Sequence, residues 1–351
     1  MPITIDGGYL KIRSKNFKQY QFDGLLKRND CFIYEKDSSC MTQTKINGLF
    51  SEKSFLLKAF QSRFVYDAEK LLITLKNLNF DLKKFLETYE DDNKTEIGKK
   101  MKVLGIHSIL RYNKSNLLTD KYTLDIVPGG DFHFRGTLGK DFITVKKSKK
   151  DMHIKADRIG DKMLHPLINF SGLQKGRYSV EIRGIMGKLT KGVIKLEGGV
   201  MSDFKAYNNA LALINTVPAL ATLSSPGFSS KGFKIKQGVI KFSIVNSRIL
   251  TFDSILIEGK SATISGDGVI NLETKKIDIN IAIQAAKSMG KVVGSLPVLG
   301  YILTGENKSI MTFGLHVSGT LDEPTTETST VKDILLLPFN MLRRTFNRPE
   351  K

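Results

Sequence analysis

Two segments of the chain alternate strictly between apolar and polar residues. Isoleucine occupies every second position of KIDINIAIQ, residues 276–284, and apolar residues do the same in MTFGLHVS, residues 311–318. Successive side chains of a β-strand point to opposite faces of its sheet, so this pattern predicts strands with one wet and one dry face. The dry positions are Ile277, Ile279, Ile281, Ile283, Met311, Phe313, Leu315 and Val317.

Shorter alternating sets recur along most of the chain. They predict strands near residues 122–126, 132–138, 152–156, 178–182, 194–196, 249–257 and 262–272, with Ile240, Phe242 and Ile244 forming another set after Gly238. Turn signals such as Pro128-Gly129-Gly130 fall between them. Many short strands at this spacing are typical of an all-β sandwich or barrel. A dry face must be buried, and a ligand or a membrane can cover it where the chain does not.

Four stretches favour helix over strand. Asp81 is placed to cap a helix whose apolar side holds Leu82 and Phe85, and residues 157–170 repeat this arrangement weakly. Residues 204–223 predict a longer apolar helix interrupted at Pro218. Residues 285–305, rich in glycine around Pro297, predict a broken helix.

The last 21 residues, 331–351, predict an amphipathic basic helix and tail. Apolar residues near helical spacing are flanked by arginines, and Pro338 splits the helix. Such a helix can lie in a membrane interface, or it can dock on the edge of the sheet and protect that edge from aggregation. Its candidate membrane or partner contacts are Ile334, Leu335, Leu342, Arg343, Arg344 and Phe346.

Composition adds a strong charge imbalance. The 351 residues carry 54 basic and 35 acidic side chains, a net charge of +19, and 41% of them are hydrophobic, enough for a sizeable core. The excess favours an anionic partner, unless it is only a solvated surface of scattered lysines. Nucleic-acid readers gather their charge into a patch, and no RNA-binding signature is present. A lipid surface is therefore preferred to nucleic acid.

The two cysteines and the ends of the chain constrain the compartment only loosely. Cys31 and Cys40 can form a disulfide in an oxidising compartment or remain two inert thiols. We find no apolar run of membrane-spanning length and no signal peptide in the sequence. The chain begins as though within a fold, so it can be the C-terminal part of a longer protein.

Catalytic chemistry has little support. The five histidines show no HExxH pairing, no CxxC is present, and no nucleophile stands beside a base. His133, His153 and His316 fall on the polar phase of predicted strands, where a solvated imidazole is expected. The sequence therefore predicts no enzyme activity, no metal and no cofactor.

Two segments carry a resemblance to a known family. Residues 208–238, NNALALINTVPALATLSSPGFSSKGFKIKQG, and 294–324, GSLPVLGYILTGENKSIMTFGLHVSGTLDEP, resemble the C-terminal region of AsmA-like proteins of the YhdP type, as does the closing ILLLPFNMLRRTF. The resemblance extends from about residue 150 onward, while residues 1–150 are compatible in pattern only.

This resemblance implies a non-enzymatic protein of the Gram-negative envelope. Members are anchored in the inner membrane by an N-terminal helix, an anchor absent from this chain, and they project across the periplasm. The implied fold is mainly β: a long, curved, open antiparallel β-groove with a few short helices. The implied role is transport of phospholipid to the outer membrane, with acyl chains sliding along the apolar interior.

The resemblance and the patterns together predict three regions. Residues 1–150 form the first part of the groove with one short helix, residues 151–330 form the AsmA-like part, and residues 331–351 form the terminal helix. The residues expected to line the groove are the eight dry positions above and Ile240, Phe242 and Ile244, although the same residues would form the core of an ordinary sandwich.

Two alternatives remain beside a phospholipid carrier that works at a membrane surface. One is a structural or assembly factor of the envelope that docks a protein partner at its C-terminal end and carries no lipid. The other, a basic nucleic-acid binder, is disfavoured. Replacing Ile281 by glutamate separates an open groove, where the fold survives, from a closed core, where it does not.

Overall fold

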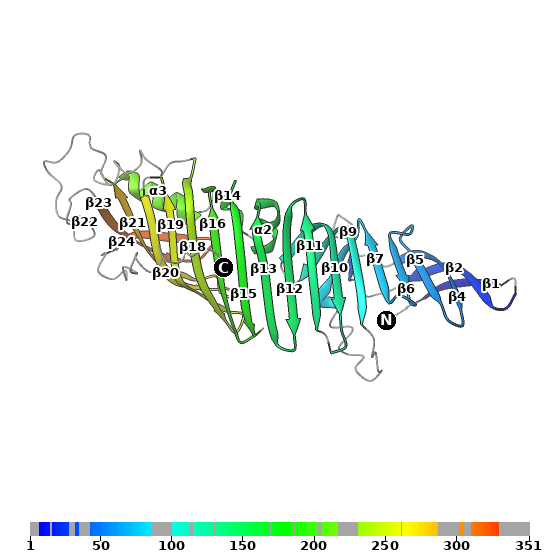
Figure 1. Cartoon of the computed structure of the whole chain (residues 1–351). Helices are drawn as coiled ribbons and strands as arrows, with labels where there is room; N and C mark the ends of the chain where they lie inside the picture. Colours follow the sequence, from blue (N-terminus) through cyan, green and yellow to red (C-terminus); the bar gives the residue numbers. More distant parts are fainter. Residues whose placement is uncertain are drawn as a thin grey trace, which may run out of the picture. The chain divides into compact units, whose positions relative to one another are not determined.

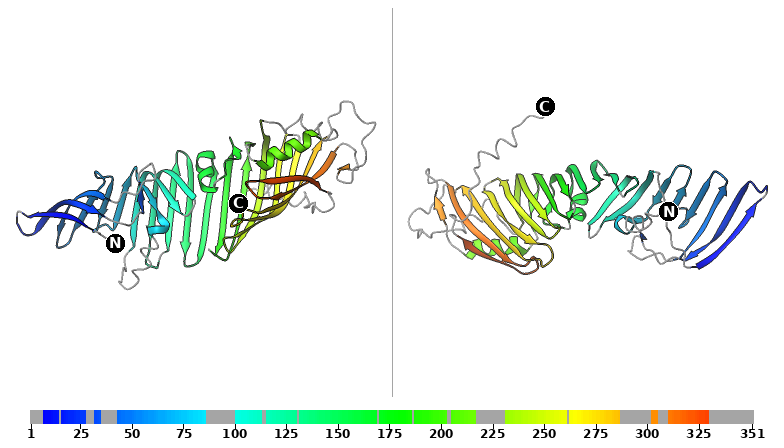
Figure 2. Two further views of the ribbon diagram at one scale, coloured as in Figure 1. Left: turned by 180° about the vertical axis from the view of Figure 1, so that it is seen from behind. Right: turned by 90° about the horizontal axis from the view of Figure 1, so that it is seen from below.

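The computed structural model describes most of the chain, and almost all of its regular structure is β. The described residues are 7–14, 16–27, 32–34, 43–85, 100–112, 115–129, 131–168, 170–185, 187–202, 205–216, 231–260, 262–286, 302–304 and 310–329. They fall into two compact units, Met1–Phe170 and Ser171–Lys351. Figures 1 and 2 show the strands of both units and their few helices.

In the first unit each strand pairs with the next one along the chain, apart from two short strands. The succession of antiparallel neighbours on one side is β1 (Gly7–Ser14), β2 (Gln19–Lys27), β4 (Gln43–Ser51), β5 (Phe55–Ala59), β6 (Phe64–Asp67) and β7 (Leu72–Lys76). The succession on the other side is β9 (Met101–Tyr112), β10 (Ser115–Ile126), β11 (Phe132–Leu138), β12 (Asp141–Ser148) and β13 (Asp151–Ile159).

Parallel pairing joins the two halves of this sheet. Strand β7 runs parallel to the first part of β9, with Ile73 opposite Val103. The chain turns at Asn77, whose φ is 52°, and then continues as β8 (Asn79–Asp81), which lies parallel to the end of β9. Strand β3 (Ile33–Tyr34) pairs with β8. The sheet of the first unit is therefore antiparallel except where β9 meets β7 and β8.

The second unit has the same ladder of neighbours, all antiparallel. Its main succession is β15 (Arg177–Ile185), β16 (Leu189–Glu197), β18 (Phe233–Val245), β19 (Ile249–Gly259), β20 (Ala262–Asn271), β21 (Ile277–Ala286), β23 (Ile310–Gly319) and β24 (Pro324–Ser329). Three short strands complete it: β14 (Leu173–Gln174), β17 (Val200–Met201) and β22 (Ile302–Thr304).

The sheet of each unit is open. Among the described pairings, β1 does not pair with β13 in the first unit, and β15 does not pair with β24 in the second. The mainly β, open-groove class that the family resemblance implied is confirmed within each unit. The closed sandwich or barrel that strand spacing alone favoured is wrong: the strands follow one another along each sheet, mostly as antiparallel neighbours, and no described strand returns to close the sheet.

Three of the four predicted helical stretches are confirmed in part. The backbone N–H of Lys84 donates to Asp81 Oδ1 at 3.0 Å, so Asp81 caps a helical turn as expected. Helix α2 (Asp161–Ile168) lies within the second stretch and contacts β10, with Met163 and Leu164 buried. Helix α3 (Lys205–Thr216) lies within the third.

The broken helix predicted for the fourth stretch, residues 285–305, is wrong for those of its residues that the structure describes. Its first two residues extend β21, and Ile302–Thr304 forms β22, which pairs with β23. The edge of β23 offers unpaired backbone groups, and the β-branched residues of ILT suit that partner better than a helix. Residues 287–301 lie outside the described part of the chain.

Aromatic rings lie over glycines at several points of the two sheets. A Cβ built on Gly105 would come within 1.9 Å of Cε1 of Tyr122, its direct neighbour across the β9–β10 pair. Phe242 covers Gly192 in the same way. A glycine beside an aromatic residue lets the ring lie down on the sheet, so bulky residues cover the backbone without overpacking.

We expect replacement of Gly105 by alanine to destabilise the first unit by about 1–3 kcal/mol, the usual cost of overpacking a core. Tyr122 is only 1% exposed, so its ring cannot move aside. Urea unfolding measures the change.

The matched control is Gly7→Ala, since a Cβ on Gly7 meets nothing within 4 Å. Equal stabilities for the two variants would contradict the assigned packing of Tyr122.

Candidate functional site

One face of the first unit is apolar from its first strand to its last. Residues directly opposite each other in a ladder share a face, so the register carries the apolar positions from strand to strand. One row across β1 to β13 is Ile12, Phe22, Gly48, Leu57, Tyr66, Ile73, Val103, Leu124, Phe134, Val145 and Ile154. We call this side the apolar face of the first unit.

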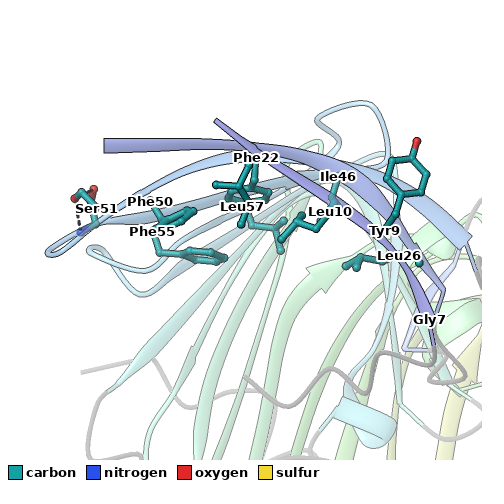
Figure 3. Close-up of a pocket in the computed structure, with 13 residues that line it drawn as sticks. Gly7, Tyr9, Leu10, Phe22, Leu26, Ile46, Phe50, Ser51, Phe55 and Leu57 are labelled. Carbon is teal, nitrogen blue, oxygen red and sulfur yellow. Dashed lines mark hydrogen bonds between the residues drawn. The ribbon is translucent and has the colours of Figure 1, made fainter. Parts of the chain in front are cut away.

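The apolar face opens into a hollow of about 870 Å³ at the β1 end. Figure 3 shows its apolar side chains in a line under the curved strands, with Ser51 at one end and Gly7 at the other, while Tyr9 points away. The hollow is lined by Gly7, Gly8, Tyr9, Leu10, Ile12, Phe22, Leu26, Ile46, Phe50, Ser51, Ser54, Phe55 and Leu57.

Stacked aromatic rings build one wall of this hollow. The ring centroids of Phe22 and Phe55 lie 5.8 Å apart, and their planes are 11° from parallel. The ring of Tyr20 stacks on that of Phe50, with 4.8 Å between the centroids. The ring of Phe55 also lies beside that of Tyr66, with 6.3 Å between the centroids. Stacked rings present flat, rigid apolar surface, which suits a long flexible hydrocarbon chain better than a shaped polar ligand.

The two serines of the hollow lie together at one end. The hydroxyl oxygens of Ser51 and Ser54 are 2.7 Å apart in the turn between β4 and β5, and the N–H of Ser54 donates to Ser51 Oγ at 3.2 Å. None of the residues that line the hollow is charged. The hollow therefore has an apolar length and one hydroxyl-bearing end.

The phenols of the apolar face remain neutral near pH 7. Burial raises the pKa of Tyr66, and the neighbouring Asp67 carboxylate adds to that rise. Burial alone raises the pKa of Tyr122 far above its usual range. A phenol is neutral near pH 7 even at its ordinary pKa, and both shifts move its ionisation further from that pH.

The second unit brings together the lining residues predicted from sequence. The register sets Ile279 opposite Val317, Ile281 opposite Leu315 and Ile283 opposite Phe313. Phe242 lies on the same face, because the register from β18 through β19 and β20 to β21 places it in one row with Ile279. Ile240 and Ile244 lie two positions before and after Phe242 in β18 and therefore share this face. We call this side the apolar face of the second unit.

Exposure differs among these residues. Ile240, Ile244, Ile279 and Ile281 are half-buried, whereas the buried ones are Phe242, Ile277, Ile283, Leu315 and Val317. Met311 lies in β23 opposite Ala285, and nothing beyond backbone placement is described for Met311 and Phe313.

Helix α3 covers one part of the apolar face of the second unit. Ala206 packs against a buried cluster of Ile270, Ile277 and Val317. The helix also contacts β24, where the side-chain amide of Asn209 donates to the carbonyl of Pro324 at 2.7 Å. The chain itself therefore covers the face around Ile277 and Val317.

The hollow of the first unit was missed by sequence reasoning. The alternation that marks it is present in Leu10 and Ile12 and again in Phe22 and Gly24, but apolar residues such as Leu25 also occupy the other phase. Glycines inside the apolar rows weaken the signal further. Counting glycine as an apolar-face residue in a sheet would have recovered the pattern.

The opposite face of the first unit is polar and basic in its second half. Cross-strand neighbours there include Lys102, Asp125, His133, Lys146 and His153 in one row. Burial lowers the pKa of His133, as does the charge of Arg135, while Asp125 partly opposes them. The register therefore places His133 and His153 on the polar face, as the alternation of the sequence predicted.

Metal sites, membrane-spanning helices and the remaining predictions concern the rest of the chain. Within the described ranges no group of three or more His, Cys, Asp or Glu could hold a metal ion. No helix among those residues has both the length and the apolar character needed to cross a membrane. Two predictions lie outside the described residues: the Cys31–Cys40 pair, and the terminal helix with Ile334, Leu335, Leu342, Arg343, Arg344 and Phe346.

Comparison with known proteins places this open apolar sheet in a family. A model of the YhdP protein family matches residues 10–326. The chain belongs to the YhdP family. No curated protein and no solved structure matches the chain. The match begins within β1 and ends within β24, so this YhdP-family chain carries the family's pattern through both units.

We expect the apolar face to tolerate polar substitution in the hollow but not in the middle of the sheet. Leu10→Ser changes a side chain that is 50% exposed, so the free energy of unfolding should shift by no more than about 0.5 kcal/mol. Ile73→Ser changes a fully buried side chain and should cost about 4 kcal/mol.

Chemical denaturation of both variants measures the difference. A large loss for Leu10→Ser would show that the hollow is packed in solution and is not open to a ligand.

Proposed function

We propose that this YhdP-family chain binds phospholipid by its acyl chains on the apolar faces and carries it between the membranes of the Gram-negative envelope. Membership of the family indicates a broad role in envelope lipid transport, and the family is generally non-enzymatic. The observation that carries the proposal is the uncharged, aromatic-walled hollow on an open apolar face.

Energetics support an acyl chain as the ligand. Removing apolar surface from water is worth about 25 cal/mol per Å², so contact along one hydrocarbon chain yields several kcal/mol without any specific polar contact. The register provides that contact as a continuous row from strand to strand. A ligand held this way can slide along the row, because neighbouring positions offer similar burial.

Uniform contact also supports release. A carrier must give up its cargo, and neither the hollow nor the apolar rows hold charges that would trap a head group at one place. The polar head then remains at the edge of the face or in water. Phospholipids with different head groups are expected to bind with similar affinity.

The first test is mass spectrometry of organic extracts from gently purified protein, beside a control protein prepared identically. We expect about one or more phospholipids per chain. A folded protein free of lipid would overturn the proposal, because an open apolar face that binds acyl chains should retain phospholipid from the membranes of the cell.

Ile281→Glu should reduce the lipid that co-purifies, because it places a charge among half-buried apolar residues. A charge buried without a partner costs several kcal/mol, so lipid contact at that position should be lost. The protein remains folded if the face around Ile281 is open, which circular dichroism checks.

The matched control is Val269→Glu, an apolar residue that is 39% exposed on the other side of β20, opposite Asp278. Its lipid content should equal that of the unaltered protein. Equal losses in the two variants would show that lipid binds without regard to the apolar face.

A further inference from the structure

The four most exposed large hydrophobic side chains of the described residues all lie in β1 and the turn after it. Phe17 is 84% exposed, Tyr9 57%, Ile12 53% and Leu10 50%. Surface hydrophobic residues scattered singly need no explanation, but a cluster of them marks an interaction site. We call residues 7–27, β1, its turn and β2, the β1–β2 hairpin.

The turn of the β1–β2 hairpin holds Phe17 out in a fixed conformation. Its φ of 54° is a left-handed value that bulky residues rarely adopt. The N–H of Phe17 donates to Ser14 Oγ at 2.9 Å, and the hydroxyl of Tyr20 donates to the carbonyl of Phe17 at 3.1 Å. Asn16 Oδ1 accepts from the N–H groups of Lys18 and Gln19. These hydrogen bonds brace the turn around an aromatic ring that is exposed to solvent.

Positive charge accompanies these apolar side chains. Lys11 and Arg13 alternate with Leu10 and Ile12 along β1, and Lys18 follows Phe17. The acidic residue of the hairpin is Asp23, whose Oδ1 lies 3.3 Å from Arg13 Nη1, and both side chains are largely exposed. The hairpin therefore carries a net positive charge next to its exposed hydrophobic residues, a combination that suits an anionic lipid surface.

We propose that the β1–β2 hairpin docks in the interface of a bilayer containing anionic phospholipid, with Phe17 inserted among the head groups. The partner is a membrane surface and not a folded protein, because the hairpin combines exposed apolar side chains with flanking cations, which match the apolar and anionic groups of a bilayer interface, and Phe17 does not line the hollow.

The charges of the β1–β2 hairpin limit how deep it can go. Lys11 and Arg13 alternate with Leu10 and Ile12 along β1. A charged side chain is costly to place in the hydrocarbon core of a bilayer. The hairpin consequently lies at the level of the head groups.

Docking there would place the hollow at the membrane. Leu10 and Ile12 belong both to the exposed cluster and to the lining of the hollow. An acyl chain leaving the bilayer beside Phe17 would enter the row of apolar residues directly. This use of the hairpin as an entry or exit point rests on the proposed function, whereas membrane docking itself does not.

The chain has no tryptophan, so a single introduced one reports its own surroundings. In Phe17→Trp, emission should shift to the blue when phosphatidylethanolamine vesicles containing phosphatidylglycerol are added, and much less with vesicles lacking it. Phe142→Trp is the control, since Phe142 is 45% exposed on β12, far along the first unit from β1, and should show no shift.

Two substitutions test the two attractions separately. Phe17→Asn keeps a residue that tolerates left-handed φ and should weaken partition onto anionic vesicles about tenfold, the worth of burying one aromatic side chain. Lys18→Gln should weaken it about fivefold, the worth of one lysine near an anionic surface, and this loss should vanish at high salt. Arg135→Gln on β11 is the charge control.

Several outcomes would overturn docking. One is unchanged tryptophan emission of the Phe17→Trp variant with both kinds of vesicle, and another is equal partition of Phe17→Asn and the unaltered protein. A blue shift that follows protein concentration without vesicles would instead assign the β1 edge to pairing with a second copy of the chain.

The two proposals fail separately. If Phe17→Asn co-purifies with normal amounts of phospholipid and still partitions normally, docking is wrong and lipid binding stands. If purified protein holds no phospholipid while the tryptophan of Phe17→Trp inserts into vesicles, docking stands and the proposed function is wrong.

Discussion

The structure depends on one constraint, the register of the β-ladder. Once hairpins pair neighbouring strands residue by residue, every second side chain must point to the same side of the sheet. In each unit this turns an alternating sequence into a continuous apolar face, from Ile12 to Ile154 in the first and from Val180 to Leu315 in the second. A slip of one residue in any strand would move its apolar side chains into water.

What differs between the units is how the face is covered. In the first, the aromatic rings near β1 lie against one another and leave a hollow beside Leu10 and Phe55. In the second, α3 lies over the cluster around Ile277. The same residue types therefore serve as packed core in one place and as open surface in another. Half-buried residues such as Ile281 lie between these extremes and are the informative positions for experiments.

Charge is separated from the apolar faces by the same alternation. Lysines and histidines of β9 to β13 share the opposite side of the sheet, whereas the phenol of Tyr122 on the apolar face is neutral near pH 7, and burial raises its pKa further. The hollow on the apolar face of the first unit is lined by hydrocarbon and aromatic side chains and by the hydroxyls of Ser51 and Ser54, and none of its lining residues is charged. The exception is the β1–β2 hairpin, where exposed hydrophobic and basic residues occur together in the same short segment. That combination is the basis of the proposed docking at a membrane surface.

Sequence alone determined which residues share a face, because period-two alternation is local and needs no knowledge of other strands. Ile277 to Ile283 and the partners Leu315 and Val317 were predictable for this reason, as was the cap at Asp81. It could not determine that Ile302–Thr304 would be a strand, since the partner that stabilises β22 is an edge created elsewhere. It also missed the hollow near Leu10, where glycines interrupt the pattern and aromatic rings fill their space. Tertiary structure decided which stretches of the apolar face are open, because cover by a helix or a ring depends on contacts between residues distant in the chain.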